Sequence, residues 1–214
     1  MTTIQLKSED PQIDPLFATP CFSFEIDNKY YLKDLTEKIL ELKKDGNGEQ
    51  VTPFDWVSSD NLHTLDEFKP LVNFIYNEMK NLFDYIALDR KDHYISCMWS
   101  NVATQGHEHQ THSHPNSFYS GVLYLQSPEG APRLSFVDPR PAAKVIRPDY
   151  NHEMTFNAAE YKMATDAGLC YFFPSWLEHY VGGGYEFNDE RISISFNIMI
   201  DAEIKNRTMQ WNIK

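Results

Sequence analysis

The chain has 214 residues and 42% hydrophobic residues, which suits one globular domain with a sizeable core. Its formal net charge of −12 disfavours non-specific binding to nucleic acid or to an anionic membrane, because like charges repel. No apolar run approaches the length of a membrane span, and the N-terminus lacks the basic and apolar regions of a signal peptide. The sequence therefore predicts a cytoplasmic protein, and its dispersed cysteines, Cys21, Cys97 and Cys170, are expected to be reduced and buried.

The first part of the chain predicts one strand and two helices. Phe22, Phe24 and Ile26 alternate with polar residues, as in a half-buried strand. A helix follows, with Asn28 as its N-cap and Gly46 as its stop. Its apolar stripe is Leu32, Leu35, Ile39 and Leu42. Pro70 then fits the first turn of a second helix. The stripe of that helix is Leu71, Ile75, Met79, Leu82 and Ile86.

From Ile95 the pattern changes to short β-rich runs separated by turn residues. These runs are "YISCMWSNV", "FYSGVLYLQ", "RLSFVDP", "GLCYFFPSW" and "RISISFNIMI". The segment Ala142–Thr165 holds only one weak strand signal, "EMTFN". We expect a single domain over residues 1–214, with a strand and supporting helices over about 1–94 and a β core over about 95–200. An antiparallel barrel or sandwich backed by the two helices is the economical architecture.

Four histidines lie within "GHEHQTHSHPN", residues 106–116. His112 and His114 are two residues apart, so on an extended chain their side chains point the same way and can chelate one metal ion. His107 and His109 have the same spacing. A third imidazole, His179, follows an apolar strand and a Pro turn in "FFPSWLEHYV".

The spacing distinguishes the two histidine pairs. In the first motif, five residues separate Gly106 from His112, and His114 follows two positions later. In the second motif, five residues separate Gly168 from Pro174, and His179 follows five positions later. This frame resembles the two metal-binding motifs of the cupins, which implies a double-stranded β-helix and selects His112, His114 and His179. The glutamate of the cupin pattern is absent, and Trp176 stands where that pattern has glycine.

A basic residue follows in the strand "RISISF". Arg191 and Ser193 share one face of this strand. A guanidinium holds a carboxylate through two hydrogen bonds, and the serine hydroxyl can add a third. A buried arginine is costly unless an anion compensates it. The alternative is a structural ion pair with one of three acidic residues, Asp138, Glu178 or Glu190.

The runs "HSHPNSFYSGVLYL", "LSFVDPR", "FFPSWLEH" and "RISISFN" together resemble the 2-oxoglutarate–Fe(II) oxygenases of marine bacteria and phages. The resemblance covers roughly Trp99–Ile198 and the strand before the first helix. It implies a jelly-roll barrel with ferrous iron at one mouth, and a hydroxylase that couples oxidative decarboxylation of 2-oxoglutarate by O2 to oxidation of a substrate C–H bond. Arg191 and Ser193, with Tyr124 and Asn116, are then the residues expected to bind the co-substrate.

One position departs from the usual oxygenase triad of two histidines and a carboxylate. His114 stands at the carboxylate position of the His-x-Asp motif. We therefore expect iron ligation by His112, His114 and His179, and keep open that Asp138 or Glu108 replaces one of them. His114 would then contact the ligands without binding the metal itself.

Two other functions fit parts of this pattern. A cupin-like metalloenzyme, such as a three-histidine iron dioxygenase or isomerase, needs the histidines but not Arg191 and Ser193. A non-catalytic binding protein could keep the barrel without the chemistry. The substrate is expected to be a small molecule or a peptide, with no nucleic-acid or membrane partner, and a homodimer is one expected state. Asn116 and Trp176 could contact substrate or be structural, and Ala142–Thr165 is long enough to form a lid over the site.

Overall fold

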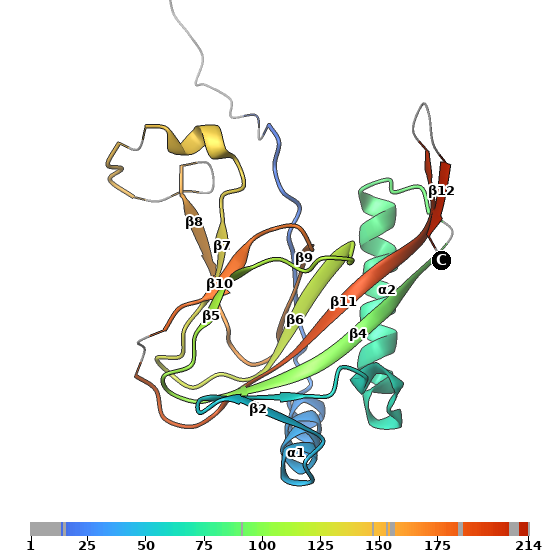
Figure 1. Cartoon of the computed structure of the whole chain (residues 1–214), viewed down its shortest axis with the longest axis vertical. Coiled ribbons are helices and arrows are strands. Elements are labelled where there is room, and N and C mark those ends of the chain that lie inside the picture. Colours follow the sequence, from blue (N-terminus) through green and yellow to red (C-terminus); the bar gives the residue numbers. More distant parts are fainter. Residues whose placement is uncertain are drawn as a thin grey trace, which may run out of the picture.

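The structure is a computed structural model of the whole chain (Figure 1), which describes residues 14, 16–90, 92–146, 148–152, 154, 157–183, 186–205 and 210–213. Within those residues, no helix is both long enough and apolar enough to span a membrane. Two antiparallel β-sheets face each other, and two helices pack on the outer face of the larger one.

The larger sheet contains eight strands in the spatial order β1-β9-β6-β11-β4-β3-β2, with β12 paired to β11. The bounds of these strands in chain order are β1 Phe22–Glu25, β2 Gly48–Thr52, β3 Asp55–Ser58, β4 Asp92–Ala103, β6 Tyr119–Gln126, β9 Leu169–Pro174, β11 Arg191–Lys205 and β12 Gln210–Ile213. The long strand β11 lies at the centre and pairs with both β4 and β6. Its first residue, Arg191, pairs with Ala103 of β4.

The smaller sheet has the order β5-β10-β7-β8. Its strands are β5 His109–His112, β7 Leu134–Val137, β8 Glu160–Met163 and β10 His179–Val181. A 3₁₀ turn, η3 (Pro141–Lys144), lies between β7 and β8 and stands at the end of this sheet in Figure 1. Since β5 pairs with β10 at His112 and His179, two of the expected metal ligands are cross-strand neighbours.

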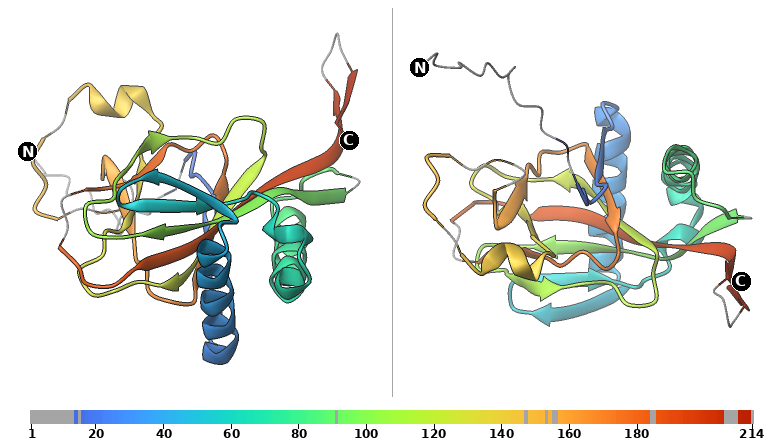
Figure 2. Two further views of the ribbon diagram at one scale, coloured as in Figure 1. Left: turned by 60° about the horizontal axis from the view of Figure 1, so that its bottom comes forward. Right: turned by 90° about the horizontal axis from the view of Figure 1, so that it is seen from above.

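The two helices form as their apolar stripes predict. Helix α1 spans Lys29–Lys44, and the Asn28 side chain caps it by accepting a hydrogen bond from the Tyr31 backbone N–H at 3.1 Å. Helix α2 spans Lys69–Tyr85, after the 3₁₀ turns η1 (Leu62–Thr64) and η2 (Asp66–Phe68). Both helices lie on the same side of the larger sheet (Figure 2).

The alternation of side chains along the strands divides the apolar residues into two cores. The first core lies between the helices and the larger sheet and includes Ile39, Ile75, Leu123, Phe172 and Phe196. The second lies between the two sheets. It contains Val122, Tyr124, Leu134, Phe136, Tyr171, Phe173, Leu177 and Val181. Of the expected site residues, Tyr124 belongs to this second core, and His112, His114, His179, Arg191 and Ser193 line a cavity together with it.

The predicted mainly-β architecture with two supporting helices is confirmed, but some elements differ. The hairpin of β2 and β3 was not expected, because its exposed β2 and its Pro53 give no clear alternation. The strand signal at residues 153–157 falls partly outside the described residues. Met154 and Asn157 are not in a strand, and β8 begins at Glu160.

The expectation that all three cysteines are buried is wrong for one of them. Cys170 is buried and Cys97 is half-buried, but Cys21 is exposed because it precedes the first residue of β1. All three are free thiols.

The packing of the larger sheet against the helices predicts a steric effect at Gly121. A Cβ added to Gly121 would lie 2.3 Å from the Phe196 ring and 2.5 Å from the Tyr171 carbonyl oxygen. Because a backbone oxygen cannot move freely, we expect Gly121→Ala to lower the free energy of unfolding by about 1–3 kcal/mol. Urea unfolding measures this change. The exposed strand residue Ser23, changed to Ala, is the control and should stay within about 0.5 kcal/mol of the parent; equal stability of both variants would contradict the packing.

Candidate metal and co-substrate site

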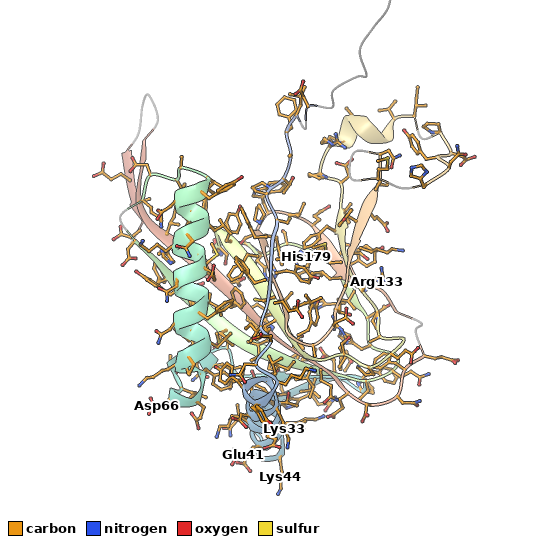
Figure 3. The ribbon with its side chains drawn as sticks, turned by 180° about the vertical axis from the view of Figure 1, so that it is seen from behind. Lys33, Glu41, Lys44, Asp66, Arg133 and His179 are labelled. Atoms are coloured by element: carbon orange, nitrogen blue, oxygen red, sulfur yellow. The ribbon has the colours of Figure 1, made fainter. Side chains whose placement is uncertain are left out.

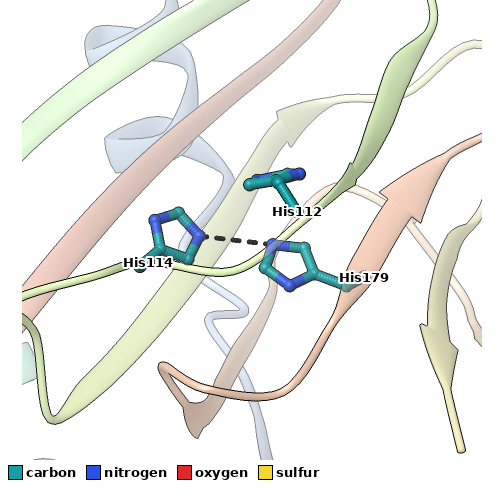
Figure 4. Close-up of side chains that lie close together, drawn as sticks. All are labelled: His112, His114 and His179. Carbon is teal, nitrogen blue, oxygen red and sulfur yellow. Dashed lines mark hydrogen bonds between the residues drawn. The ribbon is translucent and has the colours of Figure 1, made fainter.

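Three histidine side chains meet in the space between the two sheets. His112 ends β5, His179 begins β10, and His114 lies in the segment that follows β5. Their candidate ligand nitrogens all lie within 4.8 Å of one another. Figure 4 shows the three rings close together, and Figure 3 shows His179 away from the labelled residues of α1.

Backbone carbonyls fix the orientation of two of these rings. The Nδ1 atom of His112 lies 2.8 Å from the Gln110 oxygen, and Nδ1 of His179 lies 2.9 Å from the Leu177 oxygen. A carbonyl oxygen only accepts, so each Nδ1 carries the proton and donates it. The Nε2 atom of each ring is thereby left with a free lone pair, which is the form that binds a metal.

The third histidine, His114, is held through its backbone. The His114 backbone N–H donates to the Ser175 carbonyl oxygen at 2.9 Å, in the turn between β9 and β10. The Ser175 hydroxyl lies 2.8 Å from that of Ser120, and the Ser120 hydroxyl donates to Asn197 Oδ1 at 2.7 Å. Since Ser120 has one proton to donate, Ser175 must be the donor between the two serines. This buried chain of hydrogen bonds fixes the β9–β10 turn, to which the backbone of His114 is hydrogen-bonded.

The donor set fits a transition-metal ion. The Nε2 atoms of His114 and His179 are 3.2 Å apart. Two nitrogen ligands about 2.1 Å from one ion and at right angles lie roughly 3.0 Å apart. Without an ion, the same two atoms can share one hydrogen bond. Imidazole nitrogens suit iron, zinc, copper and nickel, so these residues can hold iron without excluding the other ions.

Burial keeps two of these ligands neutral at physiological pH. It lowers the pKa of His114 to about 3, with the neighbouring His179 and His112 acting in the same direction. It likewise lowers the pKa of His179 to about 4, partly opposed by the hydrogen bond to Leu177. Protons therefore do not compete with a metal for these two nitrogens near pH 7.

The structure does not bring the two alternative carboxylate ligands into this cluster. Asp138 follows β7 and forms a bidentate ion pair with Arg140, with both N–O distances 3.0 Å. Glu108 is exposed and lies against Gly183, where an added Cβ would meet its Oε2 at 2.8 Å. Neither belongs to the group of potential ligands formed by the three histidines.

Arg191 lies in the same inter-sheet space and is 3% exposed. Its guanidinium carbon lies 5.0 Å from the centre of the Tyr124 ring, and its Nε has no hydrogen-bond partner. None of the ion pairs among the described residues involves Arg191; of the acids expected as structural partners, Glu190 pairs with Lys43 at 2.7 Å. A buried cation without an anionic partner is costly, which indicates that an anion normally binds there.

A cavity of about 60 Å³ connects the histidines to Arg191. Ser193 and Tyr124 also line it, and these two residues are cross-strand neighbours on β11 and β6. Tyr124 is buried and hydrogen-bonds with Arg191. The structure thus brings together His112, His114, His179, Arg191, Ser193 and Tyr124 around one space.

Two further residues singled out in the sequence lie elsewhere. Asn116 is exposed, with a φ of 61°, and does not line the cavity. Its left-handed conformation, which asparagine tolerates, forms the turn after His114. Trp176 is 57% exposed, so it is not a core residue, and it lies in the β9–β10 turn, three residues before His179.

The sequence analysis missed two buried residues next to Arg191. Asp55, on β3, and His107, between β4 and β5, are both nearly inaccessible, and His107 lines the cavity. Their signal in the sequence was weak, because the hairpin that carries Asp55 was not expected and the spacing that selected His112 set His107 aside.

Comparison with known proteins agrees with this geometry. Residues 97–197 match the family model described as "Putative 2OG-Fe(II) oxygenase". These residues include the three histidines and Arg191. This region is therefore similar to the 2-oxoglutarate–Fe(II) oxygenases. A search of curated protein sequences gave no significant match.

Solved structures of the same fold include several oxygenases of this type. A prolyl-4-hydroxylase from Pseudomonas putida aligns with a TM-score of 0.62 at 13% identity, covering 86% of this chain and 94% of that one. The epimerase SnoN from nogalamycin biosynthesis, in complex with Fe3+, alpha ketoglutarate and nogalamycin RO, also has a TM-score of 0.62 at 13% identity, covering 86% and 80%. These likenesses support the predicted double-stranded β-helix.

A third related structure carries a different metal. HygX from Streptomyces hygroscopicus, with nickel and 2-oxoglutarate bound, aligns with a TM-score of 0.56 at 10% identity, covering 84% of this chain and 82% of that one. The expected enzyme class and cofactors, Fe(II), 2-oxoglutarate and O2, are those of the family. This agreement favours the oxygenase over the cupin-like enzyme and the non-catalytic barrel.

The triad predicts which substitutions abolish metal binding. We expect His112→Ala, His114→Ala and His179→Ala each to weaken binding of Fe(II) by at least tenfold, because each removes one of three ligands. Anaerobic equilibrium dialysis measures the affinity. His152→Ala, an exposed histidine outside the site, is the control and should bind iron like the parent.

The same assay tests the alternative ligands. Asp138→Asn and Glu108→Gln should keep the iron affinity of the parent, because neither carboxylate lies in the histidine cluster. A large loss in either variant, with an unchanged affinity in His114→Ala, would replace His114 by that carboxylate as the third ligand.

Proposed function

We propose that this protein uses His112, His114 and His179 to hold Fe(II), and Arg191 to anchor 2-oxoglutarate, in order to hydroxylate a C–H bond of a small molecule or peptide. The observation that carries the proposal is the buried guanidinium of Arg191, whose Nε has no hydrogen-bond partner, in the cavity that the three histidines line. Iron held at the histidines supplies the activation of dioxygen that couples decarboxylation of 2-oxoglutarate to oxidation of the substrate.

The residues around the cavity have distinct parts in this reaction. Arg191 offers a fork of N–H donors to the far carboxylate of 2-oxoglutarate, and Ser193 adds a hydroxyl donor from the same face of β11. The Tyr124 ring supports the guanidinium at 5.0 Å and its hydroxyl lies within hydrogen-bonding reach. This end of the cavity fixes the direction in which the co-substrate extends toward the histidines.

Apolar side chains keep bulk water from the space between the sheets. Phe173 lies 4.8 Å from the His179 ring and Phe136 lies 5.8 Å from it, both measured between ring centroids. A low-dielectric surrounding strengthens the attraction between Arg191 and a carboxylate. The rings also restrict His179 to one orientation.

The substrate side of the site is proposed from its position in the fold. Trp176 is exposed in the turn that precedes His179 and can contact a substrate that approaches the metal. Ala142–Thr165 contains most of the β7–β8 connection and β8 itself, and it is the proposed lid. Part of it, including Arg147, lies outside the described residues. The proposed location is cytoplasmic, and a homodimer is the proposed assembly.

The three-histidine ligand set by itself also suits a cupin-like dioxygenase, so Arg191 is the residue that discriminates between the two functions. We expect Arg191→Met to raise the KM for 2-oxoglutarate at least tenfold in substrate-independent turnover, because a charged hydrogen bond contributes about 1.5–3 kcal/mol. Release of carbon dioxide from C1 of 2-oxoglutarate measures turnover. Arg191→Lys keeps the positive charge but lacks the planar pair of N–H donors. Its KM for 2-oxoglutarate should therefore lie between those of the parent and Arg191→Met.

Unchanged turnover in Arg191→Met would show that Arg191 does not anchor 2-oxoglutarate. Iron bound with full affinity but no decarboxylation by the parent would favour the cupin-like enzyme instead.

A further inference from the structure

Three buried polar atoms that lack a hydrogen-bond partner belong to neighbouring side chains at one end of the cavity. They are Asp55 Oδ1 on β3, His107 Nδ1 between β4 and β5, and Arg191 Nε on β11. Buried polar atoms almost always have partners, so a cluster of unpartnered ones marks a place where a polar ligand or water belongs. The proposed function accounts for Arg191 alone.

The strand register places these residues together. Asp55 pairs with Ala103 of β4, and Ala103 pairs with Arg191 of β11. Residues directly opposite each other on neighbouring strands share one face of the sheet, so Asp55 and Arg191 project into the same space. Only the small side chain of Ala103 separates them on that face.

Asp55 lies next to His107. Its Oδ1 is 3.8 Å from His107 Nδ1, and the two side chains are 8% and 6% exposed. At that distance there is no hydrogen bond, but a small movement of either side chain would form one. His107 lines the cavity and Asp55 does not, so Asp55 can act on a ligand only through His107 or Arg191.

The proton on this pair determines what His107 can offer to a ligand. When Asp55 is ionised it only accepts, so His107 Nδ1 carries the ring proton and Nε2 is left as an acceptor. When Asp55 is protonated it can donate to Nδ1, and the ring proton then lies on Nε2. Only the second arrangement provides an N–H donor for an anion.

The surroundings determine which of the two residues takes the proton. Burial raises the pKa of Asp55 to about 6, opposed by a hydrogen bond from Asn101 and by the charge of Arg191. Burial and the charge of Arg191 lower the pKa of His107 to about 4. Arg191 on β11 and His107, with His109 beyond it, are the titratable groups that face Asp55. The proton therefore goes to Asp55, and His107 stays neutral.

We propose that His107 is a further contact for the distal carboxylate of 2-oxoglutarate, that Asp55 is its positioning residue, and that binding of the co-substrate adds one proton to Asp55. The proton comes from solvent and is released when the co-substrate leaves. This inference rests on the proposed function, because it takes Arg191 as the co-substrate anchor.

The proposal fixes the sign of the pH dependence. A bound carboxylate adds negative charge near Asp55 and raises its pKa further, so the complex holds a proton that the free protein loses above about pH 6. The affinity for 2-oxoglutarate is then highest at or below that pH. It falls by up to tenfold per pH unit above it, until the pH reaches the pKa of Asp55 in the complex.

Anaerobic calorimetry on the Fe(II)-loaded protein tests this directly. 2-Oxoglutarate is titrated at pH 7 in two buffers with different ionisation enthalpies, which gives the number of protons taken up on binding. We expect close to one proton for the parent protein and close to none for Asp55→Asn, whose amide donates to His107 at any pH. Glu49→Gln, an exposed carboxylate in the same hairpin, is the matched control and should behave like the parent.

Two affinities complete the test. Asp55→Asn should bind 2-oxoglutarate with the same affinity at pH 6 and pH 8, and at least tenfold more tightly than the parent at pH 8. His107→Gln should weaken binding at pH 6 by about tenfold, as expected for loss of one hydrogen bond to a charged group.

The outcomes separate this inference from the proposed function. If the parent binds 2-oxoglutarate without taking up a proton, the role of Asp55 is wrong while Arg191 remains the anchor. Equal proton uptake by the parent and Asp55→Asn would also contradict it. No binding of 2-oxoglutarate by the iron-loaded parent would overturn the proposed function, and this inference with it.

Discussion

The site depends on one buried cation, Arg191, which forms no ion pair with any residue that the structure describes. Arg191 is 3% exposed, its Nε has no hydrogen-bond partner, and Asp55 lies two strands away on the same face of the sheet without forming an ion pair with it. Removing a guanidinium from water costs several kcal/mol unless an anion returns that energy. In the proposed function this anion is the far carboxylate of 2-oxoglutarate, whose binding would balance the charge of Arg191.

Unlike Arg191, the three histidines are oriented by contacts within the protein. Backbone oxygens two residues earlier fix the Nδ1 atoms of His112 and His179, and the Ser175 turn fixes His114. These contacts place the candidate ligand nitrogens within 4.8 Å of one another, with 3.2 Å between the Nε2 atoms of His114 and His179. Such a site needs little rearrangement to accept a metal, which is what a preorganised centre requires.

The architecture and most of the candidate site could be predicted from the sequence, because patterns among residues close together in the chain indicate them. The stripes on α1 and α2, and the spacing from Gly106 to His114, depend only on residues close together in the chain. Asp55 could not be found in this way. It comes to lie beside His107 and near Arg191 through the pairing of β3 with β4, a contact between segments more than forty residues apart, and β3 has no clear alternation of its own.

Two other expectations depended on tertiary context in the same way. Asn116 lies close to His114 in sequence, but the left-handed turn at φ 61° directs it to the surface. Of the strand expected at residues 153–157, the described Met154 and Asn157 are not in a strand, and pairing with β7 begins at Glu160. The case of Asn116 shows that proximity in sequence to a candidate site residue is a weak guide once the chain turns.

The most direct test of the central claim is an anaerobic titration of the Fe(II)-loaded protein with 2-oxoglutarate, followed by visible absorption spectroscopy. Chelation of iron by the keto acid produces a charge-transfer band without any need for the substrate. We predict a band that saturates in the parent and that requires at least tenfold more 2-oxoglutarate in Arg191→Met. Iron that stays bound while no band develops at any concentration of 2-oxoglutarate would contradict the account.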